Sequence, residues 1–143
     1  MLPMDCHTHT GISPDGSGTV AGHIAQAEKL ELPVLALTEH VEMNRYFPQA
    51  HYGTEPRNEW EIFDHAAVLE QSLEVVTAAK EQAAANGLTL LCGMEMGQPN
   101  ADFGLSESVS GICGWISLLH RSTNYWISRI FSAWIIRRKI SRR

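Results

Sequence analysis

The chain has 143 residues, of which 44% are hydrophobic, and this content is typical of a globular protein rather than a disordered one. Its formal net charge of −5 gives no overall basic character, so nucleic acid is not an expected partner. Without a signal peptide or an apolar run of the ~18 residues that a membrane span needs, we expect a cytoplasmic protein with no membrane partner and with reduced thiols at Cys6, Cys92 and Cys113.

Two stretches of the chain differ sharply in charge. Residues 1–110 hold all 16 acidic residues and four basic ones, a net charge of −12, whereas residues 111–143 hold seven basic residues and no acidic one, a net charge of +7. Three of the four tryptophans also lie in the second stretch. The break predicts a domain at residues 1–110 followed by a basic tail at 111–143.

The first expected elements are a strand, a loop and a helix. Residues 2–6 are a short apolar run, which predicts a strand whose end carries His7 and His9. Residues 11–18 are rich in Gly, Ser, Pro and Asp, as loops are. Thr19 is a possible N-cap for a helix over residues 21–30.

Two further strands and a long helix follow. Residues 34–37 predict a buried strand that ends at Thr38-Glu39-His40, and residues 41–57 predict a long loop. Residues 59–86 give the strongest helical pattern, and Asn86-Gly87 has the residue types that stop a helix. Residues 88–92 predict another buried strand, which ends just before Glu95.

Strands that alternate with helices indicate parallel βαβ units, and thus an α/β fold. Ligand-type side chains follow each expected strand, where the loops of a (β/α) barrel converge on an active site. Successive strands would therefore deliver their polar residues to one rim: His7 and His9, then Glu39 and His40, then Glu95.

The residue types on this rim suit divalent metal ions. His7 and His9 are two apart, so on an extended strand both imidazoles point the same way. Asp15 adds a hard anionic oxygen from the loop, His40 a nitrogen, and Glu95 a carboxylate that could bridge two ions. Mixed histidine and carboxylate ligands without thiolates favour zinc, manganese or iron. Two or three such ions could activate a bound water and clamp a phosphoryl group.

Each of these signals also has a plainer interpretation. A His-x-His pair alone is more often structural, Asp15 within Ser-Pro-Asp-Gly is by itself a turn residue, and Glu39-His40 alone would be a solvated loop. The coincidence of several signals favours the metal site. Outside it we place three histidines and two methionines, expected to be structural or packing residues: His23, His51, His65, Met94 and Met96.

Four short motifs follow one another in the chain: Asp-Cys-His-Thr-His-Thr at 5–10, Ser-Pro-Asp-Gly at 13–16, Thr-Glu-His at 38–40 and Gly-Met-Glu-Met-Gly-Gln-Pro at 93–99. Together they resemble the PHP (polymerase and histidinol phosphatase) family over residues 4 to about 110, most closely its histidinol-phosphatase branch. The resemblance implies a distorted (β/α)7 barrel with a trinuclear metal centre. It also implies hydrolysis of a phosphate monoester, L-histidinol phosphate, by a metal-activated water in histidine biosynthesis.

The resemblance further implies roles for individual residues. His7, His9 and Glu95 would hold one ion, with Glu95 bridging to a second, while Asp15 and His40 would hold a third. Asp15 and His40 would thus take part in catalysis. Glu39, the acidic neighbour of His40, would position that ligand or handle protons.

The stretch after residue 110 departs from the family, whose later histidine and aspartate ligands cannot be assigned there. Shifting the reading frame from Trp115 onward, with suitable synonymous codons, yields Asp-Phe-Val-Ile-Ala-Ser-Ile-His, which restores a Ser-Ile-His motif of the family. Each Trp-Ile pair, at 115–116, 126–127 and 134–135, must then encode Asp. We therefore expect a frameshift between about residues 106 and 114; a cationic amphipathic tail that binds anionic membrane is the alternative.

The sequence thus predicts the first half of a (β/α)7-type barrel followed by a non-native basic tail. Because a whole barrel needs ~200–250 residues, we expect this chain to be incomplete and inactive as it stands. Two other functions remain open: a PHP phosphoesterase with another small phosphorylated substrate, and a truncated pseudoenzyme that binds metal. The sequence predicts no particular oligomeric state.

Overall fold

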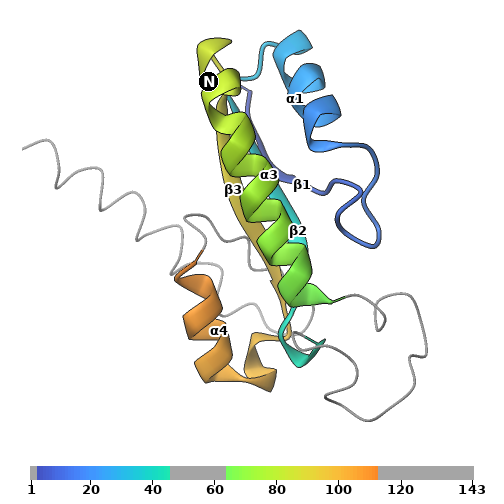
Figure 1. Ribbon diagram of the computed structural model, residues 1–143, viewed down its shortest axis with the longest axis vertical. Coiled ribbons are helices and arrows are strands. Elements are labelled where there is room, and N and C mark those ends of the chain that lie inside the picture. Colours follow the sequence, from blue (N-terminus) through green and yellow to red (C-terminus); the bar gives the residue numbers. More distant parts are fainter. Residues whose placement is uncertain (1–2, 46–63, 113–143) are drawn as a thin grey trace, which may run out of the picture.

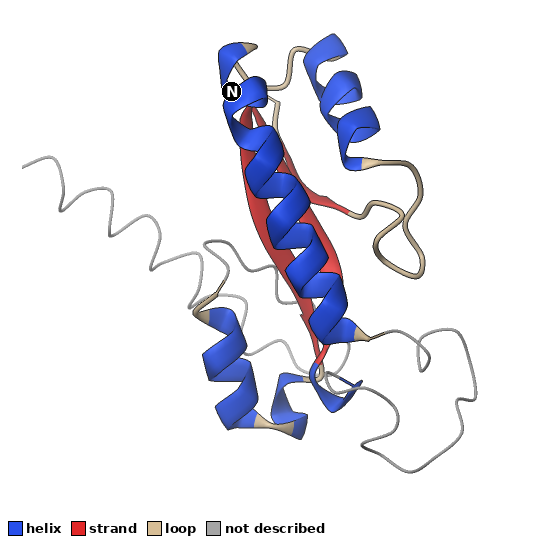
Figure 2. Ribbon diagram, viewed as in Figure 1, coloured by secondary structure: helices blue, strands red, loops and turns tan. Residues whose placement is uncertain are grey.

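The computed structural model describes residues 3–45 and 64–112 (Figure 1). Helices and strands alternate along the chain, with short 3-10 turns (η1, η3) after the second and third strands (Figure 2). In order they are β1 (Asp5–Thr8), α1 (Val20–Lys29), β2 (Val34–Glu42), η1 (Met43–Arg45), α3 (His65–Ala85), β3 (Thr89–Gly97), η3 (Pro99–Ala101) and α4 (Phe103–Ser110).

The three strands form one parallel sheet in the order β1-β2-β3. β2 and β3 stay in register along their whole length, from Val34 opposite Thr89 to Glu42 opposite Gly97. The α/β class and the parallel βαβ units predicted from the sequence are confirmed for the described residues.

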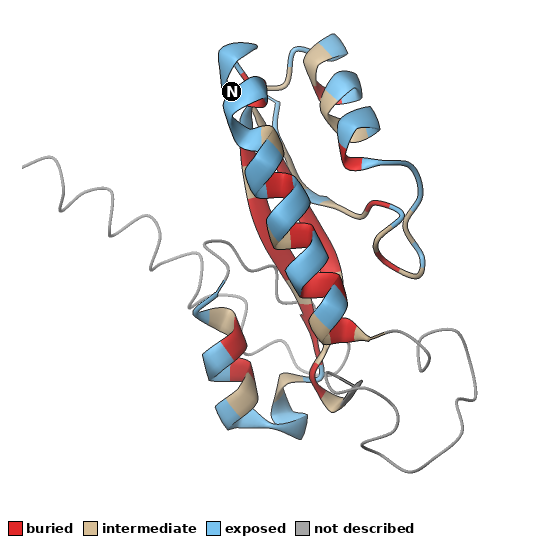
Figure 3. Cartoon of the chain, in the orientation of Figure 1, coloured by how far each residue is buried: buried red, intermediate tan, exposed pale blue. Residues whose placement is uncertain are grey.

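One face of the sheet is covered by helices. α3 lies along it, and its buried residues face the strands while its other side is exposed (Figure 3). Apolar side chains at alternate positions of β2 and β3 pack with buried residues of α1 and α3, and full burial of each Val or Leu side chain contributes about 1.5–3 kcal/mol. This core contains Val20, Ala27, Leu35, Leu37, Val76, Ala83, Leu88, Leu90 and Cys92.

A second apolar cluster lies toward the carboxyl ends of the strands. Met94 and Met96 of β3 are buried there beside Val41 of β2, Leu69 of α3 and Val109 of α4. The expectation that both methionines pack rather than bind is therefore confirmed. Side chains of a strand alternate between its two faces. Because Met94 and Met96 point into this cluster, Glu95 between them points to the opposite face of the sheet.

The helix ends follow the predicted signals. Thr19 caps α1 by accepting a hydrogen bond from the Gly22 amide, and Asp64 caps α3 by accepting from the Ala66 and Ala67 amides. Asn86 ends α3, and Gly87 has a φ of +83°, which favours glycine.

Several predicted boundaries were wrong. The first strand covers 5–8 rather than 2–6, and the strands expected at 34–37 and 88–92 run on to Glu42 and Gly97. The continuous β2–β3 pairing and the alternating burial of Val41 and Met96 carry both strands past the ends expected from their apolar runs. The ligand-type residues of these two strands therefore lie within them rather than after them.

Some predictions concern residues outside the described ranges. These are most of the loop at 41–57, the first turn of the helix expected from residue 59, His51, and the tail from residue 113 on. Closure into a barrel also lies beyond the described strands. In the ranges 3–45 and 64–112, no helix is long and apolar enough to cross a membrane.

Candidate metal centre

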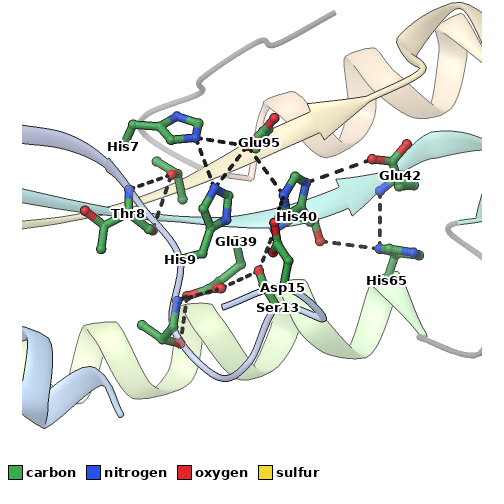
Figure 4. A network of polar contacts seen from close by, with 12 residues as sticks. His7, Thr8, His9, Ser13, Asp15, Glu39, His40, Glu42, His65 and Glu95 are labelled. Carbon is green, nitrogen blue, oxygen red and sulfur yellow. Dashed lines mark hydrogen bonds and ion pairs between the residues drawn. The ribbon is translucent and has the colours of Figure 1, made fainter. Parts of the chain in front are cut away.

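Three of the five predicted ligands, all histidines, gather around a carboxylate oxygen of a fourth, Glu95 Oε2 (Figure 4). His7 Nε2 lies 3.0 Å from it, His9 Nε2 3.1 Å and His40 Nε2 3.7 Å. His40 and Glu95 are register partners on β2 and β3, and both point to the face of the sheet opposite the helices. The parallel sheet therefore brings together side chains that are up to 88 positions apart in the sequence.

The imidazoles also contact one another. His7 Nε2 and His9 Nε2 are 3.0 Å apart, and the rings of His9 and His40 stack with centroids 4.4 Å apart. Two ring nitrogens at this distance cannot both donate a proton to each other, so at least one presents a lone pair. Lone pairs that converge from several histidines are what a metal ion requires.

The loop after β1 brings in the fifth ligand. Asp15 Oδ2 lies 3.3 Å from His40 Nε2, and the Asp15 side chain is 47% exposed. His9, Asp15 and His40 thus form a second group of potential ligands that shares His9 with the group of His7, His9 and Glu95. Within each group the ligand atoms lie within 4.8 Å of one another.

Close backbone packing shapes this loop. The Gly11 amide donates to Gly18 O at 2.9 Å, and the Gly16 amide donates to Ser13 O at 3.2 Å. A side chain at Gly16 would overlap the Thr10 carbonyl, so only glycine fits the turn that follows Asp15. The Ser-Pro-Asp-Gly motif is therefore a turn and a ligand carrier at once.

Glu39 lies on the opposite face of β2 from His40 and is 1% exposed. Its carboxylate accepts hydrogen bonds from the Thr10 amide at 3.1 and 3.2 Å, from Thr10 Oγ1 at 2.8 Å and from Ser13 Oγ at 2.5 Å. Ser13 Oγ in turn accepts from the His40 amide at 2.9 Å. Glu39 thus ties the ligand loop to β2, which fits the expected positioning role; proton handling by Glu39 stays a prediction.

The electrostatics of the cluster favour bound positive charge. The pKa of His9 is raised above its ordinary value, chiefly by the hydrogen bond of His9 with Glu95. Burial lowers this pKa, whereas the charges of nearby carboxylates raise it further. Burial alone would raise the pKa of Glu95, but its hydrogen bond with His9 and the charges of His40 and His7 lower it overall. The lowered pKa holds the Glu95 carboxylate ionised, and its negative charge favours a cation at the cluster.

The ligand spacing fits a metal ion. Atoms that share an ion at about 2.1 Å stand roughly 3.0–3.4 Å from one another in octahedral or tetrahedral geometry. Glu95 Oε2 and the Nε2 atoms of His7 and His9 are 3.0–3.1 Å apart, and the Asp15–His40 contact is 3.3 Å. The predicted convergence of the five ligands is thus present in the structure, and divalent metals suit this donor set.

Two described histidines outside the cluster, His23 and His65, make structural contacts. His23 Nε2 lies 2.8 Å from Ser17 O in the ligand loop. His65 is fully buried and begins α3, because Asp64 caps the helix directly before it; the helix expected over residues 59–86 would have placed His65 inside it. Its Nδ1 accepts a hydrogen bond from the Glu42 amide at 3.3 Å and lies 3.4 Å from His40 O.

Sequence reasoning missed Glu42. This residue shares the ligand face of β2 with His40, and its Oε1 lies 4.0 Å from His40 Nδ1. Glu42 lies two positions after His40, and on a strand this spacing places both side chains on the same face. The spacing could not be used while β2 was expected to end at residue 37.

Comparison with known proteins gives one match. The model of the PHP domain family matches residues 5–138, a range that contains all five converging ligands and continues past the charge break at residue 110. No curated protein and no solved structure matches the chain.

Proposed function

Since the chain belongs to the PHP domain family, whose members are generally metal-dependent phosphoesterases, we propose that this centre hydrolyses a small phosphate monoester. The observation that carries the proposal is the contact of one Glu95 oxygen with imidazoles from β1, from the loop that follows it and from β2, next to a second ligand group that contains Asp15. Two adjoining groups with a shared histidine suit neighbouring ions.

Each ligand would have a distinct task. His7, His9 and Glu95 would hold one ion, and His9, Asp15 and His40 would hold another. Bound divalent ions supply Lewis acidity, which lowers the pKa of water and neutralises charge on a phosphoryl group. Asp15, whose side chain is 47% exposed, is the more exposed of the two carboxylates, so a phosphate ester could approach the centre from its side.

The substrate we propose first is L-histidinol phosphate, in cytoplasmic histidine biosynthesis. The support is the likeness of the four motifs to the histidinol-phosphatase branch. The net charge of −12 over residues 1–110 disfavours long polyanions such as nucleic acids, which leaves small phosphate esters as the better class. Another small phosphorylated substrate is the nearest alternative.

A metal-binding pseudoenzyme is the second candidate. It is favoured by the composition of residues 111–143, which provide no acidic residue toward the further ligands that the family resemblance implies. Such a chain would bind metal at the described cluster and turn over no substrate.

A phosphatase assay on the full chain separates these candidates. The chain would be purified without metal, reloaded with manganese, zinc or iron, and incubated with L-histidinol phosphate and with a panel of small phosphate esters. Release of phosphate that depends on metal and is lost in Glu95→Gln, but kept in Glu74→Gln on the exposed side of α3, supports the enzyme. Metal binding without phosphate release from any ester supports the pseudoenzyme.

A further inference from the structure

A carboxylate outside both ligand groups lies beside the centre. Glu42 follows His40 by two positions on β2, so both side chains project from the same face of the sheet. Glu42 Oε1 is 4.0 Å from His40 Nδ1, and the Glu42 side chain is 20% exposed (Figure 4). The contact joins the two side chains on the edge of the imidazole away from Asp15.

The two nitrogens of His40 face different groups. Nε2 points to Asp15 Oδ2 at 3.3 Å and to Glu95 Oε2 at 3.7 Å, which is the side on which a metal would sit. A histidine that binds a metal through Nε2 keeps its proton on Nδ1, and that N–H needs an acceptor that fixes the ring. The Glu42 carboxylate lies on this edge of the ring, with Oε1 4.0 Å from His40 Nδ1.

The neighbouring strand leaves room for this carboxylate. Gly97 is the register partner of Glu42 on β3, and a Cβ on Gly97 would overlap the Glu42 carboxylate. The described glycines with positive φ are Gly18 and Gly87, so the backbone at position 97 does not itself call for glycine. The absence of a side chain at Gly97 therefore makes room for the Glu42 carboxylate on the neighbouring strand.

The backbone of Glu42 is held as well. Its amide donates to Nδ1 of the fully buried His65, and the same nitrogen lies 3.4 Å from His40 O. The first residue of α3 thus holds the β2 backbone at His40 and Glu42, the two residues whose side chains face each other.

We propose that Glu42 is a positioning residue for His40. When a metal binds Nε2, the Glu42 carboxylate would move in from its present 4.0 Å to accept the Nδ1–H of His40 and would hold the ring toward the metal. The inference rests on the proposed metal centre but not on the phosphatase reaction, because its readout is metal affinity.

Zinc binding by the full chain tests the role. Affinity would be measured by competition with a chromophoric chelator, and stoichiometry by elemental analysis at saturating zinc. Removing a carboxylate that orients a ligand weakens metal binding about 10- to 100-fold. We expect Glu42→Ala to fall in this range with unchanged stoichiometry, and Glu42→Gln to lose less, because its amide oxygen still accepts from Nδ1. Glu74→Gln is the matched control and should bind zinc as the parent chain does.

Gly97→Ala gives a second route to the same contact. The overlap is with the end of a flexible side chain, so alanine should displace the carboxylate and leave the fold intact, which circular dichroism would check. The variant should weaken zinc binding as Glu42→Ala does, and the two changes should not add in the double variant. If the Gly97→Ala chain does not fold, the zinc affinities of the two Glu42 variants alone test the role of Glu42.

Three results would overturn the role: parent affinity in Glu42→Ala, a lower zinc stoichiometry in that variant, which would make Glu42 a ligand, or no zinc binding by the parent chain. A chain that shows the expected affinity pattern but cleaves no phosphate ester would contradict the proposed phosphatase function and leave the role of Glu42 standing.

Discussion

Three imidazole nitrogens lie close to Glu95 Oε2, and they are too crowded for all of them to carry protons. His7 and His9 lie 3.0 and 3.1 Å from this oxygen and 3.0 Å from each other, so full protonation of both would set two cations in contact. A single divalent ion can replace those protons and bind all three side chains at once. The crowding of the site is therefore the residue-scale sign that a metal belongs there.

Loss of Glu95 should cost more metal than loss of Asp15. Glu95→Ala removes the oxygen that contacts three histidines, whereas Asp15→Ala removes one exposed ligand of the second group. We expect elemental analysis after reloading with zinc to give a lower metal content for Glu95→Ala. Glu74→Gln, a charge loss on the exposed side of α3, should keep the parent content. Equal metal content in the Glu95 and Asp15 variants would refute a bridging role for Glu95.

Metal affinity should fall as the solution becomes more acidic. The pKa of His9 is raised in the metal-free chain, chiefly by its hydrogen bond with Glu95, so a proton competes with the metal even above the ordinary histidine range. Zinc affinity, measured by chelator competition, should be highest above that raised pKa and decline as pH falls through it. An affinity that stays constant from the raised pKa down to mildly acidic pH would contradict His9 as a ligand.

At the scale of elements, the loop between β1 and α1 depends on a buried charge. Glu39 accepts hydrogen bonds from Thr10 and Ser13, and Ser13 also accepts from the His40 amide. This arrangement couples the position of the Asp15 loop to the strand that carries His40. The second ligand group is thus preassembled by side chains that do not themselves touch the metal.

Glu39→Gln should loosen this coupling. The amide keeps one acceptor but turns an NH₂ group toward the Thr10 and Ser13 donors, which leaves at least one buried donor without an acceptor and costs about 1–3 kcal/mol. Urea unfolding with a chelator present should show this loss, while Glu81→Gln on the exposed side of α3 should not. Unchanged stability of Glu39→Gln would mean that the loop does not depend on the carboxylate.

The elements themselves were largely predictable. Apolar runs and the signals at Thr19 and Asn86-Gly87 located α1, the end of α3 and the starts of β2 and β3, because local patterns determine caps and buried strands. The helix α4 was not predicted. The lengths of β2 and β3 were not predictable, since Glu39, His40 and Glu95 interrupt the apolar pattern and only strand pairing shows that the strands continue. The five candidate ligands could be predicted from their places next to apolar runs, whereas the contact of Glu42 with His40 depends on β2 continuing to residue 42.

At the scale of the whole molecule, the charge break at residue 110 is the feature that the described structure does not explain. We propose that it marks a shift of reading frame between about residues 106 and 114. The nucleotide sequence tests this: the shifted frame should encode acidic residues and a Ser-Ile-His motif and remain open downstream. The family match, which extends through residue 138, instead favours an unshifted reading frame in this stretch. A stop codon soon after the shift would refute the proposal.

His9 belongs to both ligand groups, so the proposed metal centre depends on it more than on any other single ligand. The most direct measurement is equilibrium dialysis of the purified full chain against zinc or manganese, with metal content determined per chain. The account predicts bound metal in the parent chain, a loss at both groups in His9→Ala, and parent behaviour in His23→Gln, whose histidine contacts the Ser17 carbonyl instead. A parent chain that binds neither metal, or a His9→Ala variant that binds as much as the parent, would contradict it.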